Sequence, residues 1–455
     1  MFKRAIPIAM SFVGVVVGAG FASGQEMLQY FIAFGGIGRL GAIIAGVIMM
    51  AAGAITLAYG SYLRAKEHLV VFDRMALPLT SKLLDFAVLC TCFSTGFVML
   101  SGAGSNLNQQ FGLPTLVGMV IMLVLVLATG FLDVDAVSKV IGAITPFIMI
   151  FLVGGGIYVL VTTTPDHAAL EQASAQVATN LPNWWISSFN YVGMTLMVGI
   201  SMAIVIGGAN LMPRAAALGG LMGGTVWAVL VVLLVFALYL RVDEVYADDM
   251  PLLSIVTQVN PMLGNLMGIV VFGMIFNTAV GMFYSMAKRI TRNKPENFRK
   301  VYVIGVLVGF CFSFIPFTTL VGIVYPISGY IGIILIAVMF IAWFRGRVVI
   351  TEESSRRARI RDLLSRKLDP RRRYTRKHAA QLKKEIRESN IDEAELRVIM
   401  HEDVLEELDA DDDVDVDRDV DLPPDIEKAR AEAKAAEEDT DGSPGPGRGD
   451  AERPD

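Results

Sequence analysis

The sequence predicts an all-α polytopic membrane protein with ten transmembrane helices, followed by a C-terminal tail that is mostly helical and then disordered. Three observations predict this class. Hydrophobic residues make up 54% of the chain and the mean hydropathy is +0.55, well above the average of soluble proteins. The apolar residues gather in segments of about 20, the length that crosses a bilayer core. Charge is segregated, since residues 1–350 carry 18 Lys+Arg and 13 Asp+Glu, and residues 351–455 carry 21 and 31.

Ten apolar segments are predicted to cross the membrane. In chain order they are residues 5–35, 38–63, 84–105, 115–132, 141–163, 184–210, 215–240, 262–288, 301–319 and 320–344. The last two are divided within "FIPFTTL", because Pro316 interrupts a helical run.

Lysine and arginine lie almost entirely on one side of the predicted membrane. If the N-terminus is cytoplasmic, the inner segments hold 16 of these residues and the outer segments hold only Arg39 and Arg241. Positive charge is retained on the cytoplasmic side of membrane proteins. We therefore expect a multi-pass protein of the cell (plasma) membrane with both termini in the cytoplasm.

The first span, residues 5–35, is too long for one helix. Its 31 residues would extend about 46 Å as a helix, against a hydrocarbon core of about 30 Å. Three glycines in "GAGFASG" each lower helix propensity by about 1 kcal/mol relative to alanine. The sequence therefore predicts two half-helices, 5–17 and 25–35, joined by unwound backbone at 18–24.

Two explanations compete for the glycines of this span. Gly14 and Gly18, and likewise Gly20 and Gly24, have the spacing that lets membrane helices pack closely. Glu26 favours a functional site instead, because a carboxylate inside a membrane is costly and usually serves function. Unwound backbone within a membrane is tolerated where protein buries it or a watery cavity meets it, and its carbonyls can bind cations.

The ten spans divide into two halves of opposite topology at the outer loop 164–183. Residues 1–163 form the first five-helix repeat and residues 184–344 the second, the inverted-repeat arrangement of many secondary transporters. The sixth span should then be broken like the first, and Gly193 with its polar neighbours marks the expected place. The alternative is an interfacial Trp184–Trp185 pair above an ordinary helix.

The candidate solute-binding residues are small or polar groups near the middle of the first, third and sixth spans. They are Gly18, Ala19, Gly20, Ser23, Gly24, Gln25, Glu26, Ser94, Thr95, Ser188, Asn190 and Tyr191. The candidate ion-coupling residues combine the first span with the eighth, and they are Val17, Gly20, Glu26, Asn277, Thr278 and Ser285. Their oxygens could bind Na⁺, whereas an isolated Ser or Thr in a membrane helix more often bonds to its own backbone.

Other functional classes find little support in the sequence. Cys90, Cys92 and Cys311 lie in apolar segments and cannot form a disulfide scaffold or a four-ligand metal site. All four histidines lie outside the spans, and no nucleophile–base pair stands out, so we expect neither an enzyme nor a bound cofactor. A G-x-x-x-x-G-K-[ST] motif is absent, which disfavours an ATP-driven pump.

The string "VGAGFASGQE", which follows a short charged N-terminus, resembles the YkvI family of bacterial membrane proteins. The resemblance covers about residues 1–345, and it extends more loosely to the amino acid–polyamine–organocation transporter superfamily with its LeuT-like fold of five plus five helices. It implies a cation- or proton-coupled carrier of a small organic solute, such as an amino acid. A receptor or sensor with the same pocket and a signalling tail is the alternative.

Na⁺ and H⁺ both remain open as the coupling ion. Some relatives of this fold place a lysine in the fifth span, but here Lys139 lies at the cytoplasmic end of that span, which disfavours lysine-based coupling. Glu26 could pair with a substrate ammonium or carry a coupling proton. These roles are not distinguished by the sequence.

The tail is predicted to contain a basic and then amphipathic helical segment, 346–408, and an acidic disordered end, 409–455. Residues 351–384 hold 13 Lys+Arg and 4 acids, so anionic lipid is the expected partner of 356–384. No aromatic platform accompanies these charges, so nucleic acid is not expected. Helical spacing of apolar residues over 375–407 involves Leu382, Ile386, Ile391, Leu396, Ile399 and Val404.

Overall fold

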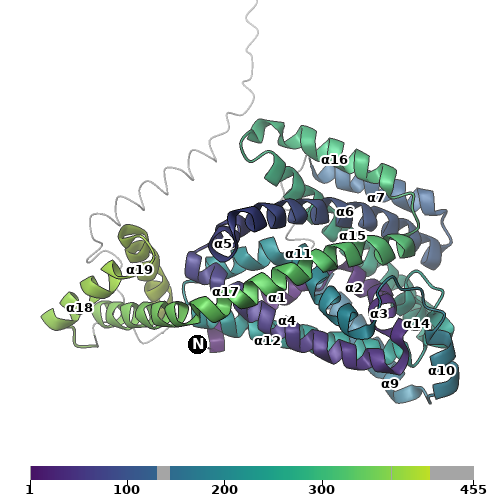
Figure 1. Ribbon diagram of the computed structural model, residues 1–455, viewed down its shortest axis with the longest axis horizontal. Coiled ribbons are helices and arrows are strands. Elements are labelled where there is room, and N and C mark those ends of the chain that lie inside the picture. The colour runs from purple at the N-terminus through teal and green to yellow at the C-terminus, as the bar shows by residue number, and fades with distance from the viewer. Residues whose placement is uncertain (1, 131–143, 370, 410–455) are drawn as a thin grey trace, which may run out of the picture. The chain divides into compact units, whose positions relative to one another are not determined.

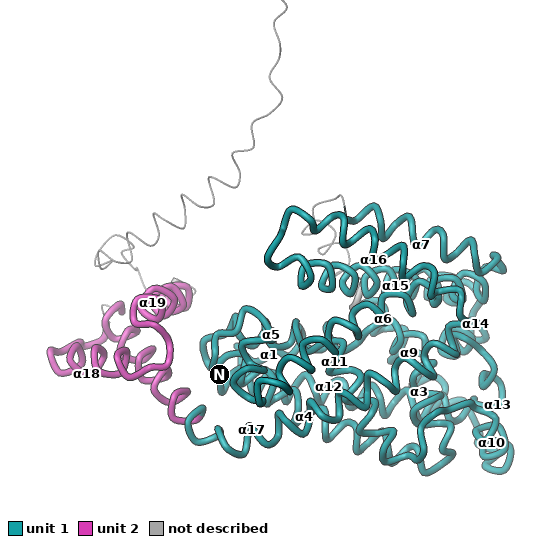
Figure 2. Tube along the Cα trace, turned by 45° about the horizontal axis from the view of Figure 1, so that its top comes forward, with its two compact units in different colours: residues 1–350 teal, residues 351–455 magenta. Residues whose placement is uncertain are grey.

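The computed structural model describes residues 2–130, 144–369 and 371–409, and helices are the only regular structure in these residues. The all-helical class predicted from the sequence is thus confirmed. The chain forms two compact units that meet between Ile350 and Thr351, shown in different colours in Figure 2. Lys139, the start of the fifth predicted span and the acidic end of the tail after Asp409 lie outside the described residues.

The first unit contains both long apolar helices and short connecting ones (Figure 1). In chain order the helices are α1 (Phe2–Val16), α2 (Ala19–Ser23), α3 (Gln25–Tyr30), η1 (Ile32–Ile37), α4 (Gly38–Leu63), α5 (His68–Met75), α6 (Pro78–Phe111), α7 (Thr115–Thr129), α9 (Ile144–Thr162), α10 (His167–Ser174), α11 (Trp184–Ala209), α12 (Pro213–Tyr239), α13 (Val242–Val245), α14 (Pro251–Val259), α15 (Pro261–Ile290), η2 (Pro295–Asn297), α16 (Phe298–Phe312) and α17 (Phe317–Leu368). Helix α17 continues past Ile350 into the second unit, which also contains α18 (Arg376–Arg387) and α19 (Glu393–Asp409).

Helix ends follow from local side-chain chemistry. The side chain of Asn183 accepts a hydrogen bond from the Ile186 N–H at the start of α11, and Asn260 caps α15 in the same way. Proline stands at the first position of α6, α12, α14 and α15, where the missing N–H costs nothing. Gly112 ends α6 with a φ of 67°, a left-handed conformation that glycine adopts without strain.

Six of the described helices are long and apolar enough to cross a membrane. They run over Ile32–Leu63, Pro78–Phe111, Trp184–Ala209, Pro213–Tyr239, Pro261–Ile290 and Phe317–Leu368. Large apolar side chains such as Val47, Phe86 and Val229 lie exposed on them, as expected of surfaces that face lipid. The chain is therefore a transmembrane protein, while the count of ten spans stays a prediction.

Every predicted span nevertheless contains a helix in its described part. Helix α4 coincides with the predicted 38–63, and α11 lies within one residue of the predicted 184–210. Helices α16 and α17 are separated at Ser313–Pro316, a stretch that ends with the proline at which the last two spans were divided. In the packed unit, α4 lies against α11 and α12, while α6 lies against α15 and α7 (Figure 1).

The expected break in the sixth span is wrong. Helix α11 runs without interruption from Trp184 to Ala209. A β-carbon on Gly193 would lie 2.6 Å from the carbonyl oxygen of Gly329 and 2.9 Å from the amide nitrogen of Ile333, both on α17. Gly193 therefore serves close contact between two helices, the use of small residues that is common in membrane proteins.

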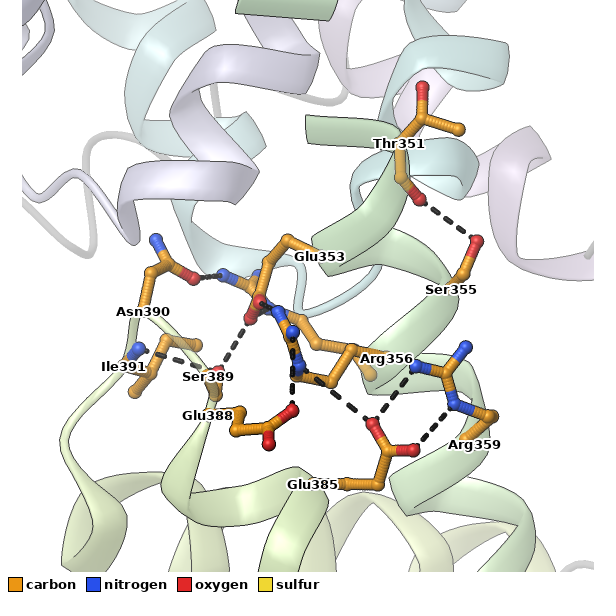
Figure 3. Close-up of polar contacts among 11 residues, drawn as sticks. Thr351, Glu353, Ser355, Arg356, Arg359, Glu385, Glu388, Ser389, Asn390 and Ile391 are labelled. Carbon is orange, nitrogen blue, oxygen red and sulfur yellow. Dashed lines mark hydrogen bonds and ion pairs between the residues drawn. The ribbon is translucent and has the colours of Figure 1, made fainter. Parts of the chain in front are cut away.

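The second unit is organised around the carboxylate of Glu353, which lies on α17 just after the helix enters this unit (Figure 3). This carboxylate accepts hydrogen bonds from Arg357 Nε at 2.9 Å, Arg356 Nη1 at 2.9 Å and Ser389 Oγ at 2.5 Å. Arg357 is fully buried, and its Nη2 donates to Asn390 Oδ1 at 2.8 Å. The long helical stretch expected over 375–407 is divided into α18 and α19, and the network lies beside this division.

Replacing Arg357 with alanine is expected to destabilise the second unit by about 3–5 kcal/mol, because the charge of Glu353 would stay buried after losing its main partner. Hydrogen exchange of the α18 and α19 amides in the full chain measures the effect, which should appear as faster exchange there. Arg366→Ala is the control, since Arg366 pairs with Asp362 on an exposed surface, where such pairs contribute at most about 1 kcal/mol. Equal exchange in the two variants would contradict this account.

Candidate functional site

The first span is broken at two points, Val17–Gly18 and Gly24, and not over the whole of 18–24. Helix α1 ends at Val16, and the five-residue α2 fills most of the stretch that was expected to be unwound. Gly24 separates α2 from α3 with a φ of 82°, which strongly favours glycine. Helix α3 ends at Tyr30, short of the expected residue 35.

Ser23 explains why so short a helix forms here. Its hydroxyl donates to the Gly20 carbonyl at 2.7 Å and accepts from the Gln25 N–H at 3.1 Å. These two bonds satisfy backbone groups that the break would leave unpaired in a buried place, which replaces the expected open loop with a compact turn.

Glu26 lies in the first turn of α3 and is only 7% exposed. Its Oε2 accepts a hydrogen bond from the Tyr191 hydroxyl of α11 at 3.0 Å. The carboxylate also lies directly over Gly20, where any β-carbon would overlap with it. Among the described residues, no lysine, arginine or histidine forms an ion pair with Glu26.

Hydrogen bonds connect α3 to α11 and α17 next to this carboxylate. The Tyr30 hydroxyl donates to Asn190 Oδ1 at 3.2 Å, and Asn190 Nδ2 donates to the Pro326 carbonyl at 3.0 Å. Ser187 Oγ donates to the Tyr30 carbonyl at 2.5 Å. The three helices therefore hold Glu26 and its partner in one fixed arrangement.

Aromatic rings position the Tyr191 hydroxyl. The ring of Tyr191 stacks on Trp227 of α12 with centroids 5.5 Å apart and meets Phe31 edge-on at 5.2 Å. Tyr30 packs on a further side at 5.1 Å. Such contacts add about 0.5–1.5 kcal/mol each and restrict the ring, so the hydroxyl stays directed at Glu26.

A cavity of about 40 Å³ lies between the broken span and its neighbours. Ligand pockets usually measure about 300–1,000 Å³, so this one suits water, an ion or a few atoms. Its walls come from α1, α2, α3, α6, α11, α15 and α17. The lining residues are Val15, Val16, Gly18, Ala19, Gly20, Phe21, Glu26, Thr95, Met99, Met194, Thr195, Val198, Thr278 and Tyr325.

Six of the predicted site residues meet at this cavity, and they are Gly18, Ala19, Gly20, Glu26, Thr95 and Thr278. Val17, Ser23, Gly24, Gln25, Asn190 and Tyr191 are buried near it without being among its lining residues. Thr278 Oγ1 donates to the Met274 carbonyl of its own helix at 3.0 Å, the alternative foreseen for isolated hydroxyls.

Four predicted residues lie elsewhere. Ser188 bonds to the Trp184 carbonyl of its own helix at 2.8 Å. Ser94 bonds to the Thr91 carbonyl and borders a separate apolar groove of about 490 Å³ between α6, α15 and α17. Asn277 is half-buried and Ser285 is exposed, and neither is a lining residue of the cavity.

Sequence reasoning missed Thr195 and Tyr325, the other two polar lining residues. Thr195 could have been found, because it lies four residues after Tyr191 and so on the same helix face. Tyr325 had no comparable signal, since only tertiary packing brings α17 to the break in the first span.

Two polar clusters lie on opposite sides of the predicted membrane. On the predicted outer side, Glu171 Oε1 accepts from the Gly36 N–H and the Tyr239 hydroxyl, both at 2.8 Å. The guanidinium of Arg39 lies over the Tyr239 ring, 4.4 Å from its centroid. These contacts attach α10 to the turn that follows α3.

On the predicted inner side, His68 stands between α6 and α11. Its Nε2 lies 3.0 Å from Asp85 Oδ1, and its Nδ1 lies 2.9 Å from Ser201 Oγ. Arg289 of α15 pairs with the same Asp85 oxygen at 2.6 Å and with Glu67 at 3.1 Å. The cluster joins four helical segments through α5, α6, α11 and α15.

The inner cluster should make stability depend on pH. Burial lowers the pKa of the His68 imidazole below its usual 6.5, against the opposing effect of the Asp85 hydrogen bond. A lowered pKa means that the unfolded chain takes up the proton first, so stability should fall as pH drops below about 6.5. Between about pH 8 and pH 5, the melting temperature of the wild type should decrease more than that of His68→Gln. Parallel curves would contradict the assignment.

Fold and site together define a polytopic helical membrane protein that carries a buried carboxylate beside a break in its first predicted span. Two proteins of Bacillus subtilis (strain 168) are similar to it in sequence. The membrane protein YkvI is 24% identical over 334 residues, which cover 73% of this chain and 94% of YkvI. The protein YyaD is 20% identical over 329 residues, which cover 72% and 94%. The resemblance to YkvI is thus confirmed, while no family model matches the chain.

Several solved transporters align with the structure at low identity. Mhp1 in an inward-facing conformation aligns over 75% of this chain and 76% of its own, with 14% identity and a TM-score of 0.48. MhsT in complex with L-phenylalanine covers 88% and 96%, with 15% identity and a TM-score of 0.48. A manganese transporter of Eremococcus coleocola covers 95% and 91%, with 13% identity and a TM-score of 0.44.

Proposed function

We propose that the protein is a secondary transporter that moves a small organic solute by alternating access around the cavity at Glu26, with H⁺ or Na⁺ as the coupling ion. The observation that carries the proposal is a buried carboxylate without a basic partner among the described residues, set beside interrupted backbone inside a membrane protein. Intramembrane ionisable residues of this kind usually belong to substrate or ion pathways. Discontinuous helices with sites at the break are characteristic of secondary transporters.

The proposed architecture has ten spans in two inverted repeats, 1–163 and 184–344, with both termini cytoplasmic. The two polar clusters support alternating access, because opening either side would require breaking one set of contacts, at Glu171 or at Arg289. With both clusters formed, as in this structure, the cavity of about 40 Å³ is too small for an amino acid. Solute entry therefore needs a conformational change, as alternating access demands.

The tail is proposed to contact anionic lipid through α18. Arg356, Arg357, Arg359 and Arg361 are engaged in ion pairs with acidic side chains and are poorly suited to lipid. One face of α18 presents basic residues that are all exposed, and they are Arg376, Lys377, Lys383, Lys384 and Arg387. Lys384 also lies 3.9 Å from Glu388, as an exposed pair. Within the segment predicted for lipid contact, 356–384, we therefore place the contact on α18, which extends it to Arg387.

A transport assay separates a carrier from a receptor that binds without transport. A thermal-shift screen of amino acids and organic ions, with and without Na⁺, first identifies ligands, because ligand binding raises apparent stability. Uptake of the best ligand into proteoliposomes is then measured with and without imposed Na⁺ and H⁺ gradients. Gradient-driven accumulation supports the carrier, and tight binding without any flux would favour the receptor.

A further inference from the structure

Glu26 faces only neutral groups in the described part of the chain. The titratable side chains around it are the phenols of Tyr30 on α3, Tyr191 on α11 and Tyr325 on α17, while α1, α2, α6 and α15 contribute none to the cavity. Phenols ionise near pH 10, so they stay neutral at physiological pH. Glu26 is therefore the group among these residues whose charge can change.

An ionised carboxylate in this place needs a counter-charge. One hydrogen bond from Tyr191 at 3.0 Å compensates part of the cost of removing the carboxylate from water, but an isolated buried charge stays strongly unfavourable. Two species can neutralise Glu26 in a closed cavity, namely a proton on the carboxyl group or a cation beside it. The proton and the cation exclude each other, because each neutralises the Glu26 carboxylate that attracts the other.

We propose that the solute is a small organic ammonium ion and that it exchanges with a proton at Glu26, an inference that rests on the proposed transport function. In the exchange the O–H bond of the Glu26 carboxyl group breaks, the ammonium takes its place as a hydrogen-bonding ion pair, and the proton leaves to solvent. No other bond changes. The net charge of the cavity is the same before and after, so each form can be closed within the membrane.

The lining disfavours a zwitterionic amino acid. A solute carboxylate would bring a second negative charge into the cavity, and the described lining contains no lysine, arginine or histidine to balance it. Thr195 and Thr278 already donate their hydroxyl protons to backbone carbonyls of their own helices. Among the described lining side chains, only the Thr95 and Tyr325 hydroxyls have no hydrogen bond, and neither hydroxyl can balance a second negative charge.

The lining favours an organic cation over a hard metal ion. Hard cations such as Ca²⁺ or Mg²⁺ need six or more oxygen ligands, whereas most of this wall is apolar, including Met99, Met194 and Phe21. Alkyl groups gain from such surroundings, and aromatic rings attract ammonium ions through their faces. In this conformation, the volume of about 40 Å³ has room for an ammonium group with a few carbons.

Proton release on binding tests this inference in the purified full chain. The probes are ethylammonium and L-alanine, which share the ammonium and methyl groups and differ by one carboxylate. In a weakly buffered detergent solution with a pH indicator, ethylammonium should release about one proton per protein, and L-alanine should release none. The apparent affinity for ethylammonium should rise tenfold per pH unit in the range where Glu26 is protonated, because ethylammonium then competes with one proton.

Two variants make the outcome specific. Glu26→Gln keeps a hydrogen-bond acceptor for Tyr191 and should release no proton. Tyr191→Phe keeps the carboxylate and should still release one, so the result stays interpretable if Glu26→Gln fails to fold. Equal release by L-alanine, release by NaCl alone, absence of ethylammonium binding, or binding that is independent of pH would each overturn the inference.

Failure of this inference is distinguishable from failure of the proposed function. Gradient-driven flux of a neutral or zwitterionic solute, without competition by ethylammonium, would support the proposed transport function and contradict the exchange at Glu26. Conversely, proton release on ethylammonium binding, without flux in proteoliposomes, would support the binding site and contradict the proposed transport function.

Discussion

Glu26→Gln is expected to reduce solute uptake into proteoliposomes by about 30-fold or more and to abolish its pH dependence. Removing the charge from a buried pair costs about 2–5 kcal/mol, and each 1.4 kcal/mol is a factor of ten. The variant keeps the size of the side chain and its contact with Tyr191, so the loss should come from the charge itself. Initial uptake rates at several pH values measure both effects.

Glu244→Gln is the matched control for this experiment. Glu244 pairs with Arg241 at 2.7 Å on an exposed surface, where such pairs contribute little. Its uptake should equal that of the wild type at every pH. An unchanged rate and pH profile in Glu26→Gln would exclude both the substrate-binding and the proton-carrying role of the carboxylate.

Gly193→Ala is expected to destabilise the transmembrane unit by about 1–3 kcal/mol, and more if the helices cannot separate. The added methyl group would lie 2.6–2.9 Å from backbone atoms of Gly329, Gly332 and Ile333, which cannot rotate away as a side chain can. The melting temperature of the detergent-solubilised protein reports the loss.

Gly154→Ala provides the contrasting result. Gly154 is an exposed residue of α9, and a β-carbon there would meet no atom within 4 Å. Alanine has the higher helix propensity by about 1 kcal/mol, so this variant should be as stable as the wild type or more stable. Equal losses in the two variants would mean that contact with α17 does not explain Gly193.

The helical segments were predictable from the sequence because runs of apolar residues near 20 long are set by bilayer thickness alone. The break in the first span was predictable because the span is longer than the bilayer core requires and contains clustered glycines and Glu26. The break predicted at Gly193 was wrong because, in a sequence, a glycine is equally compatible with a helix break and with a close contact between helices. Only the position of Gly329 and Gly332 on α17 distinguishes the two uses.

The site was predictable where its residues share one local segment and less so where helices converge. Gly18, Gly20 and Glu26 stand within nine residues, and their meeting follows from the break itself. Thr95 and Thr278 were foreseen from their depth in the third and eighth spans. Ser94 is the neighbour of Thr95 in sequence but points to another groove, since adjacent helical residues face about 100° apart. The rotation of each helix about its own axis is set by packing against its neighbours, which the sequence pattern does not predict.

The most direct measurement of the central claim is proton movement in sealed proteoliposomes under an ethylammonium gradient, with a pH indicator trapped inside. If Glu26 carries either a proton or the organic cation across, an outward ethylammonium gradient should acidify the lumen faster and further in wild-type vesicles than in Glu26→Gln vesicles, where only passive diffusion of the neutral amine remains. Acidification of the same size in the variant, or none in the wild type while ethylammonium leaves the vesicles, would contradict the account.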